Sequence, residues 1–128
     1  MKEKLLSKLD KFSYKYKVEG ETVVIDLGAY LEMSVKFNGE KIEIKDKLRA
    51  WNFLTGMMNM SIKQSVVYNT IAVVVAVIII MIAVKVEHFD ASSAILISIM
   101  SMTWVLIWTI YYTFVAEQMK SRIINWLN

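Results

Sequence analysis

Residues 64–84 read QSVVYNTIAVVVAVIIIMIAV, a stretch of about 21 residues without a charged side chain. A helix of about 20 residues is long enough to cross the hydrocarbon core of a bilayer. Valine and isoleucine usually favour strands, but this stretch is too long for one strand, and a lone strand cannot pair its backbone groups in lipid. The stretch therefore predicts a transmembrane helix.

A second uncharged stretch covers residues 91–116, about 26 residues, which is enough for a tilted span. Only residues 85–90, KVEHFD, separate the two stretches. Because so short a link holds both helices side by side and antiparallel, the sequence predicts a transmembrane hairpin with spans at about 64–85 and 91–116.

The charged residues lie mostly before the first apolar stretch, in a chain that is 56% hydrophobic and 21% charged. Lys63 precedes the first stretch, Lys120 and Arg122 follow the second, and the link carries one basic residue, Lys85. By the positive-inside rule, both termini face the cytoplasm, and we expect an integral protein of the bacterial cytoplasmic membrane. The lipid bilayer is the expected partner, whereas nucleic acid is not, because the chain offers few arginines.

Small or polar side chains recur along both stretches at spacings of three, four and seven. Helices pack closely in lipid through such side chains, so we interpret them as a seam within one hairpin or between copies of it. The seam residues are Asn69, Ala72, Ala76, Ala83, Ala94, Ser98 and Ser101. Asn69 has two interpretations, an interhelical hydrogen bond or a residue lining a pore.

Aromatic residues near the ends of the stretches fit the belt that tyrosine and tryptophan form at membrane–water interfaces. The expected anchors are Trp51, Tyr68, Trp108, Tyr111, Tyr112 and Trp126. Neither stretch contains an ionisable Asp, Glu, Lys, Arg or His. This argues against a proton- or ion-coupled carrier and leaves a passive pore open.

The start of the chain predicts an amphipathic basic helix over residues 2–12. Its apolar stripe, Leu5, Leu9, Phe12 and Tyr16, recurs at helical spacing. The stripe either covers a sheet or lies on anionic lipid, and we favour the sheet because strand-like sequence follows immediately.

Four short runs then predict an antiparallel meander of three or four strands, at residues 13–18, 22–27, 29–37 and 41–45. Turns at Glu19-Gly20 and Asn38-Gly39 would place Tyr16 opposite Val23 and Val35 opposite Ile42, with the apolar side chains on one face. The same register places Lys36 opposite Lys41. The two lysines either extend into water or form a site for an anion or an acidic partner.

A further helix is predicted from residue 47 to about residue 60, with Asp46 as its cap. Leu48, Trp51, Leu54 and Met58 would form its apolar stripe. Residues 117–128 are expected to extend the second membrane helix into the cytoplasm, with an interfacial anchor as their role.

The sequence offers little chemistry for catalysis. It has no cysteine and one histidine, His88, in the link. We therefore expect no enzyme and no catalytic, cofactor-binding or metal site.

The predicted fold is that of an α+β membrane protein in two parts. Residues 1–63 form a small cytosolic module of a helix, three or four antiparallel strands and a helix. Residues 64–128 form the transmembrane hairpin and a short cytosolic helix. We expect the hairpin to homo-oligomerise while the module senses a partner or ligand, giving a pore-forming or membrane-perturbing effector. The alternative is an accessory or anchoring subunit that binds an unrelated protein in a larger membrane complex.

Overall fold

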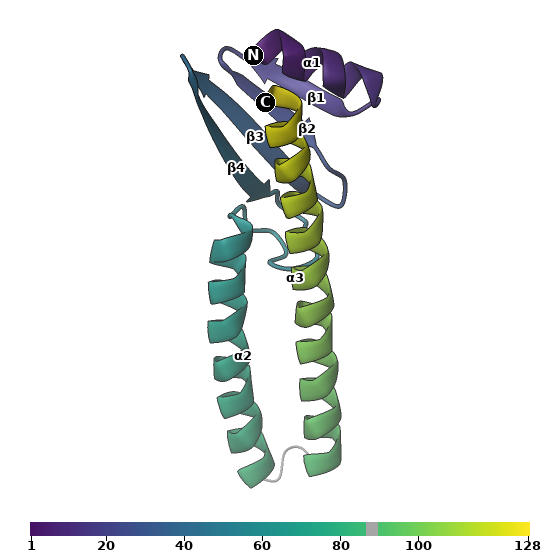
Figure 1. The fold of residues 1–128 in the computed structure, drawn as a ribbon. Helices are drawn as coiled ribbons and strands as arrows, with labels where there is room; N and C mark the ends of the chain where they lie inside the picture. Colours follow the sequence, from purple (N-terminus) through teal and green to yellow (C-terminus); the bar gives the residue numbers. More distant parts are fainter. Residues whose placement is uncertain (87–89) are drawn as a thin grey trace.

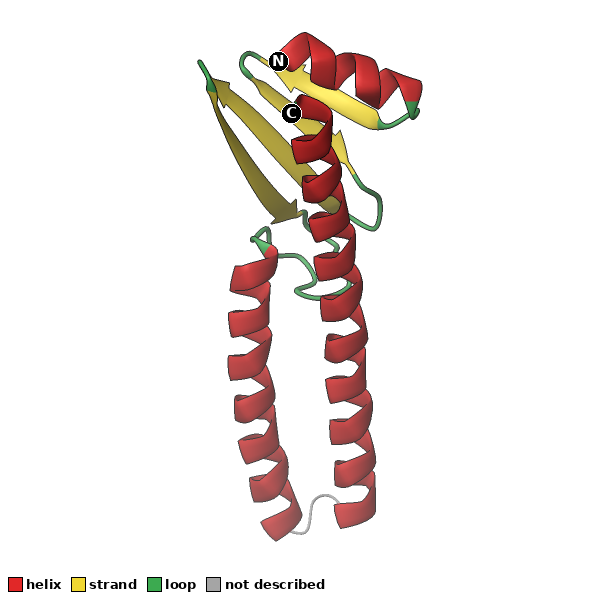
Figure 2. Cartoon of the chain, viewed as in Figure 1, coloured by secondary structure: helices red, strands yellow, loops and turns green. Residues whose placement is uncertain are grey.

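The computed structural model describes residues 1–86 and 90–128 of the chain (Figures 1 and 2). The elements in chain order are α1 (Lys2–Lys11), β1 (Lys15–Glu19), β2 (Thr22–Asp26), β3 (Leu31–Asn38), β4 (Lys41–Leu48), α2 (Ile62–Lys85) and α3 (Ala91–Leu127). The predicted N-terminal helix, the antiparallel strands and the two long apolar helices are confirmed. Glu87, His88 and Phe89 of the predicted link lie outside the described residues.

The four strands form one antiparallel sheet in the order β1-β2-β3-β4, so each strand pairs with its neighbour in sequence. Apolar and polar side chains alternate along β3, where every second residue from Leu31 is buried. This alternation gives the sheet one apolar face, as its sequence predicts.

The predicted register of both hairpins was wrong by two residues. Tyr16 pairs with Ile25, and Val35 pairs with Ile44. Gly20 and Gly39 each occupy the first loop position with positive φ, +57° and +64°, which is the pattern of a type II′ turn. Because the shift is an even number of residues, every side chain keeps its predicted face.

The corrected register separates the two lysines of the predicted anion site. Lys36 lies opposite Glu43, and Lys41 lies opposite Asn38. A hydrogen bond from Lys45, whose Nζ lies 2.7 Å from Glu43 Oε1, lowers the pKa of the Glu43 carboxyl, and the charge of Lys36 lowers it further. This face of the sheet therefore pairs opposite charges where the sequence predicted like ones.

The predicted helix over residues 47–60 was also wrong. Strand β4 continues to Leu48, and residues 49–61, hereafter the junction loop, connect it to α2 without a regular helix. Asp46 caps a different helix, because its carboxylate accepts a hydrogen bond of 2.7 Å from the backbone N–H of Ile62, at the start of α2. Ser61 and Gln64 complete a capping box at the same end.

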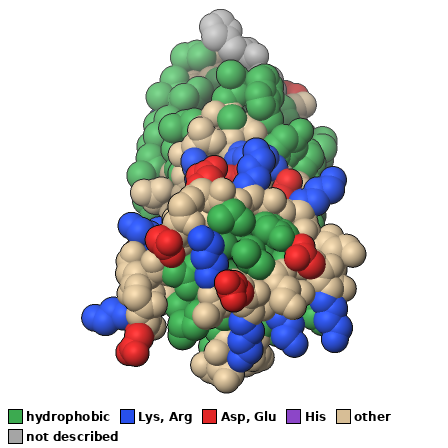
Figure 3. Space-filling model, turned by 90° about the horizontal axis from the view of Figure 1, so that it is seen from above, with side chains coloured by type: hydrophobic (Ala, Val, Ile, Leu, Met, Phe, Trp, Pro, Cys, Tyr) green, Lys and Arg blue, Asp and Glu red, His purple; other side chains and the backbone are tan. Residues whose placement is uncertain are grey.

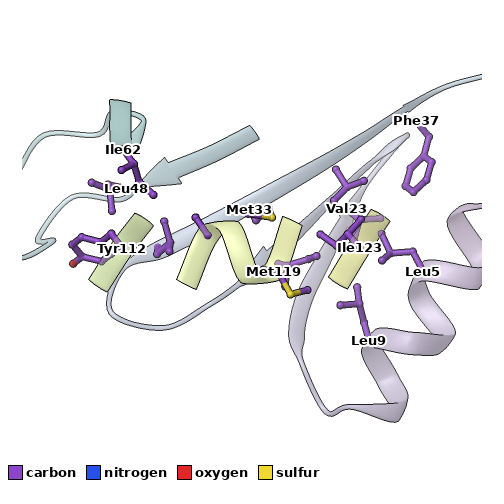
Figure 4. Packing of buried hydrophobic residues seen from close by; sticks show 14 of the residues in the cluster. Leu5, Leu9, Val23, Met33, Phe37, Leu48, Ile62, Tyr112, Met119 and Ile123 are labelled. Carbon is purple, nitrogen blue, oxygen red and sulfur yellow. The ribbon is translucent and has the colours of Figure 1, made fainter. Parts of the chain in front are cut away.

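Helix α1 and the C-terminal part of α3 cover the apolar face of the sheet (Figures 1 and 4). Leu5 and Leu9 from α1, Val23 from the sheet and Ile123 from α3 are all fully buried there. The favoured interpretation of the N-terminal stripe, packing on the sheet, is confirmed for Leu5 and Leu9. We call α1, the four strands and residues 112–127 of α3 the sheet module, since together they make its core.

Helix α2 and residues 91–111 of α3 extend away from the sheet module as an antiparallel pair, hereafter the hairpin (Figure 1). Both helices are long and apolar enough to cross a membrane, yet only 6% of the most apolar 18-residue window of each is buried inside the structure. Figure 3 shows charged side chains gathered over the sheet module and hydrophobic side chains covering the hairpin beyond it.

Candidate functional site

The two parts of the molecule meet where the β2–β3 turn, the junction loop and the middle of α3 converge. Tyr112 of α3 is fully buried at this point. Its hydroxyl donates a hydrogen bond of 2.8 Å to the Ala29 carbonyl and accepts one of 3.1 Å from the backbone N–H of Phe53. One side chain of α3 thus joins the β2–β3 turn to the junction loop.

The backbone around Tyr112 is strained. Ala29, Tyr30 and Trp51 have positive φ angles of 48°, 64° and 69°. Positive φ is unfavourable for residues with a Cβ, costs on the order of 1–3 kcal/mol each, and recurs at functional sites and ligand clamps. Three such residues at one junction indicate that the surrounding contacts hold it in a defined geometry.

Arg49 reinforces the same junction from the end of β4. Its backbone N–H donates to the Tyr30 carbonyl at 2.8 Å, and its guanidinium lies 3.4 Å from Asp26 Oδ2 and 3.3 Å from Glu32 Oε1. The guanidinium is half-exposed, so these ion pairs orient the side chain more than they stabilise the fold.

Asn52 organises the interior of the junction loop. Its amide side chain is buried and accepts hydrogen bonds from the backbone N–H groups of Leu54 and Thr55, at 2.9 and 2.7 Å. Its Nδ2 donates to the carbonyls of Arg49 and Met58, at 2.8 and 3.2 Å. The loop is therefore built around one polar side chain rather than around an apolar core.

A hollow of about 480 Å³ with a mixed polar and apolar lining lies between the strand ends and α3. Lys15, Asp26, Gln118 and Arg122 contribute its polar lining, and Arg122 Nη1 donates to the Tyr14 hydroxyl at 2.6 Å. Two cationic groups beside one carboxylate suit a small ligand that carries an anionic group and a hydrogen-bond donor.

Two apolar hollows of about 460 and 500 Å³ lie between the helices of the hairpin. The one nearer the sheet includes the polar side chains of Asn69, Thr70, Thr103 and Thr109. The one nearer the tip is almost wholly apolar. The two helices therefore leave part of their facing surfaces unfilled.

The predicted seam residues do not all face this space. Asn69 and Ala94 are buried between the helices and Ser98 and Ala83 are half-buried, whereas three others are exposed: Ala72, Ala76 and Ser101. The Asn69 side chain donates to the Ser65 carbonyl of its own helix at 2.9 Å, in place of the predicted interhelical bond. The exposed members remain free for a seam between copies.

The predicted membrane-interface anchors also include both exposed and buried side chains. Trp51, Tyr68 and Tyr111 are exposed, while Trp108 is half-buried and stacks on Phe53 at 4.2 Å between ring centroids. Tyr112 is buried in the junction, and Trp126 packs in the sheet module, where it stacks on Phe12. Burial of Tyr112 leaves its ring no surface for lipid, whereas Trp126 is half-buried and its predicted anchoring role stays a prediction.

Sequence reasoning missed the roles of Asn52, Arg49 and Tyr112. For Asn52 a signal was available, since Asn52, Thr55 and Gly56 are turn-forming types within the segment assigned to a helix. For Tyr112 there was none, because its partners Ala29 and Phe53 lie 83 and 59 residues away in sequence.

No family model matches the chain, and no curated protein or solved structure is significantly similar to it.

Proposed function

We propose that this chain is an integral membrane protein whose hairpin crosses the bilayer and whose sheet module lies on one side of it. The observation that supports this most is the exposure of the hairpin. Ile71 in α2 and Ile110 in α3 are each 60% exposed, and most of the apolar side chains around them are exposed too. In water such a surface would aggregate, whereas lipid covers it at no cost.

Both chain ends lie at the sheet end of the hairpin (Figure 1). Lys63 at the start of α2, and Lys120 and Arg122 in the C-terminal part of α3, belong to the same end. The positive-inside rule then assigns the sheet module to the cytoplasm. This orientation is part of the proposal.

Within the membrane, the hairpin acts by self-association. Unfilled hollows between α2 and α3 and the exposed Ala72, Ala76 and Ser101 offer places where helices of a second copy can pack closely. The hollow beside Arg122 is where the sheet module would take its ligand. We propose a pore-forming or membrane-perturbing effector that needs no enzymatic step.

The test is reconstitution of the full chain into dye-loaded vesicles, together with cross-linking in native membranes. The expected results are resistance to alkaline carbonate extraction, cross-linked multimers and dye release. Ala72→Leu/Ala76→Leu fills the exposed seam, so it should reduce cross-linking and dye release together. Ile71→Leu/Ile78→Leu, on an exposed face of α2 that lines neither hollow, is the control and should change neither.

Three outcomes would count against the proposal. Extraction by carbonate would exclude the membrane assignment. Monomers with intact vesicles would exclude the effector role. Stable co-purification with an unrelated polypeptide, without any dye release, would favour the alternative of an accessory or anchoring subunit.

A further inference from the structure

The junction loop does not pass straight from β4 to α2 but descends along α3 before it returns (Figure 1). Phe53 stacks on Trp108, and its carbonyl accepts a hydrogen bond of 2.9 Å from Trp104 Nε1. The start of α2 lies level with Ala116, because Ile62 and Ala116 line the same hollow. Trp108 is eight residues nearer the tip than Ala116, about 12 Å along the helix. The loop therefore reaches about two helical turns below the start of α2.

The part of the loop that descends is apolar on its outer side. Residues 50–62 carry no charged side chain, and Lys63 follows them directly. Trp51 is 65% exposed and Met57 is 68% exposed. An aromatic and a methionine side chain exposed beside a lysine, at this level of an apolar hairpin, match the composition of segments that lie in a membrane interface.

The loop also meets the condition that lipid sets for irregular backbone, namely that its polar groups find partners within the protein. Asn52 pairs with four backbone groups of the loop, as described above. Tyr112 and Trp104 pair with the N–H and the carbonyl of Phe53. Asn59 accepts from the Ala50 N–H at 2.6 Å. A loop needed only to connect β4 with α2 in water would not require this many internal partners.

We propose that residues 50–58 are an interfacial loop that enters the headgroup region of the leaflet next to the sheet module. Trp51 and Met57 reach the upper acyl chains, while the ammonium group of Lys63 lies among the lipid phosphates. The occupant of this surface is a lipid bilayer rather than a protein, since the exposed side of the loop continues the exposed side of the hairpin at the same level. The inference rests on the proposed function, because it needs an inserted hairpin.

Single cysteines can test the depth of the loop directly, since the chain has no cysteine of its own. Met57→Cys and Trp51→Cys are labelled with an environment-sensitive fluorophore in the full chain, in vesicles of phosphatidylcholine and phosphatidylglycerol. Insertion into the interface should shift the emission of both labels to the blue, because their surroundings become less polar. Lipids with a nitroxide near the headgroup should then quench both labels by about twofold or more. Both side chains are exposed, so neither substitution removes a core contact.

Two control sites make the result decisive. Lys41→Cys, at the distal turn of the sheet, should show neither quenching nor blue shift. Ile78→Cys, in the middle of α2, should be quenched best by a nitroxide deep in the acyl chain. Quenching at Ile78 without quenching at Met57 and Trp51 would overturn the loop inference and leave the membrane assignment intact. Absence of quenching at all of these positions would overturn the membrane assignment as well.

A protein partner on the loop is the remaining outcome. In that case the label at Met57 would shift to the blue but would respond to neither nitroxide lipid. It would instead cross-link to a second copy or to a co-purified polypeptide. This result would also overturn the proposal that lipid covers the loop.

Discussion

Leu9 and Ile25 in the sheet module are fully buried, whereas Ile71 and Ile110 in the hairpin are each 60% exposed. The side chains are of the same kind, so their surroundings rather than their chemistry distinguish the two regions. The sheet module encloses its apolar residues with elements of the same chain. The hairpin leaves most of its apolar side chains exposed, so only something outside the chain can cover them. Apolar composition alone therefore does not show where a core lies.

The strongest way to break this comparison is to remove volume from each region. Ile123→Ala takes a fully buried side chain out of the sheet module and should lower the free energy of unfolding by about 2–5 kcal/mol. Ile78→Ala, at a position that is 52% exposed, should change it far less. Denaturant titration of the full protein in detergent, followed by tryptophan fluorescence, measures both. Equal losses would show that the hairpin has a core of its own.

The junction loop has buried residues, as the sheet module does, and exposed apolar residues, as the hairpin does. Removing the buried Asn52 side chain should have the next largest effect on stability. Asn52→Ala leaves the N–H groups of Leu54 and Thr55 and the Arg49 carbonyl without their partner, while the Met58 carbonyl still accepts from the Thr55 hydroxyl. Local opening should become easier by about 2–4 kcal/mol, because each buried polar group without a partner is costly. Hydrogen exchange at the Thr55 amide measures this change. Asn38→Ala, at the exposed end of β3, is the control and should leave exchange at Thr55 unchanged.

Tyr112→Phe tests the connection between the two regions while keeping the ring. The substitution removes the hydroxyl that joins Ala29 and Phe53, with an expected loss of about 1–2 kcal/mol. The matched change Tyr111→Phe, at an exposed ring, should have little effect. The same denaturant titration applies. Stability equal to that of the unsubstituted protein would mean that the Tyr112 hydroxyl does not hold the junction together.

The smallest expected effect is a change in the pKa of Glu43 on the exposed face of the sheet, and it tests the register of β3 and β4. Lys45→Met removes the main cause of the lowered pKa of Glu43, so this pKa should rise toward its ordinary value. Lys36→Met should raise it less, and Lys41→Met, which lies opposite Asn38, should not change it. NMR titration of the Glu43 carboxyl distinguishes the three variants.

The sign of the linked pH effect follows from the lowered pKa. Glu43 stabilises the fold at pH values above its ordinary, unfolded-state pKa. This contribution disappears as the pH falls through the lowered, folded-state pKa. Because the carboxyl is exposed, the change in stability should be small and should weaken further as salt is added.

The elements that a sequence pattern can predict are those with long, regular repeats. The uncharged stretches predicted α2 and α3, and the alternation along residues 31–37 predicted β3. Hairpin register was harder, since Gly20 and Gly39 can occupy either central position of a two-residue turn, and the two choices differ by two residues. The faces were still correct because an even shift preserves them.

The errors fall where contacts distant in sequence decide the structure. Residues 47–60 have a helical spacing of apolar side chains, but pairing of Leu48 with Met60 and burial of Asn52 stabilise a loop instead. Tyr112 and Trp126 are residue types typical of lipid anchors, yet Tyr112 is buried against the β2–β3 turn and the junction loop, and Trp126 is half-buried against Phe12, just after α1. These partners cannot be read from the neighbourhood of either residue in the chain.

The path of α3 has a consequence for the order in which the molecule forms. The strands are synthesised first, but Ile123, which completes their core, follows only after both helices of the hairpin. Contacts such as Arg122 with Tyr14 close a loop of 108 residues. The apolar face of the nascent sheet therefore stays partly uncovered until the C-terminal part of α3 has been synthesised and packs on it. Closure of the sheet module thus reports that the hairpin before it is complete.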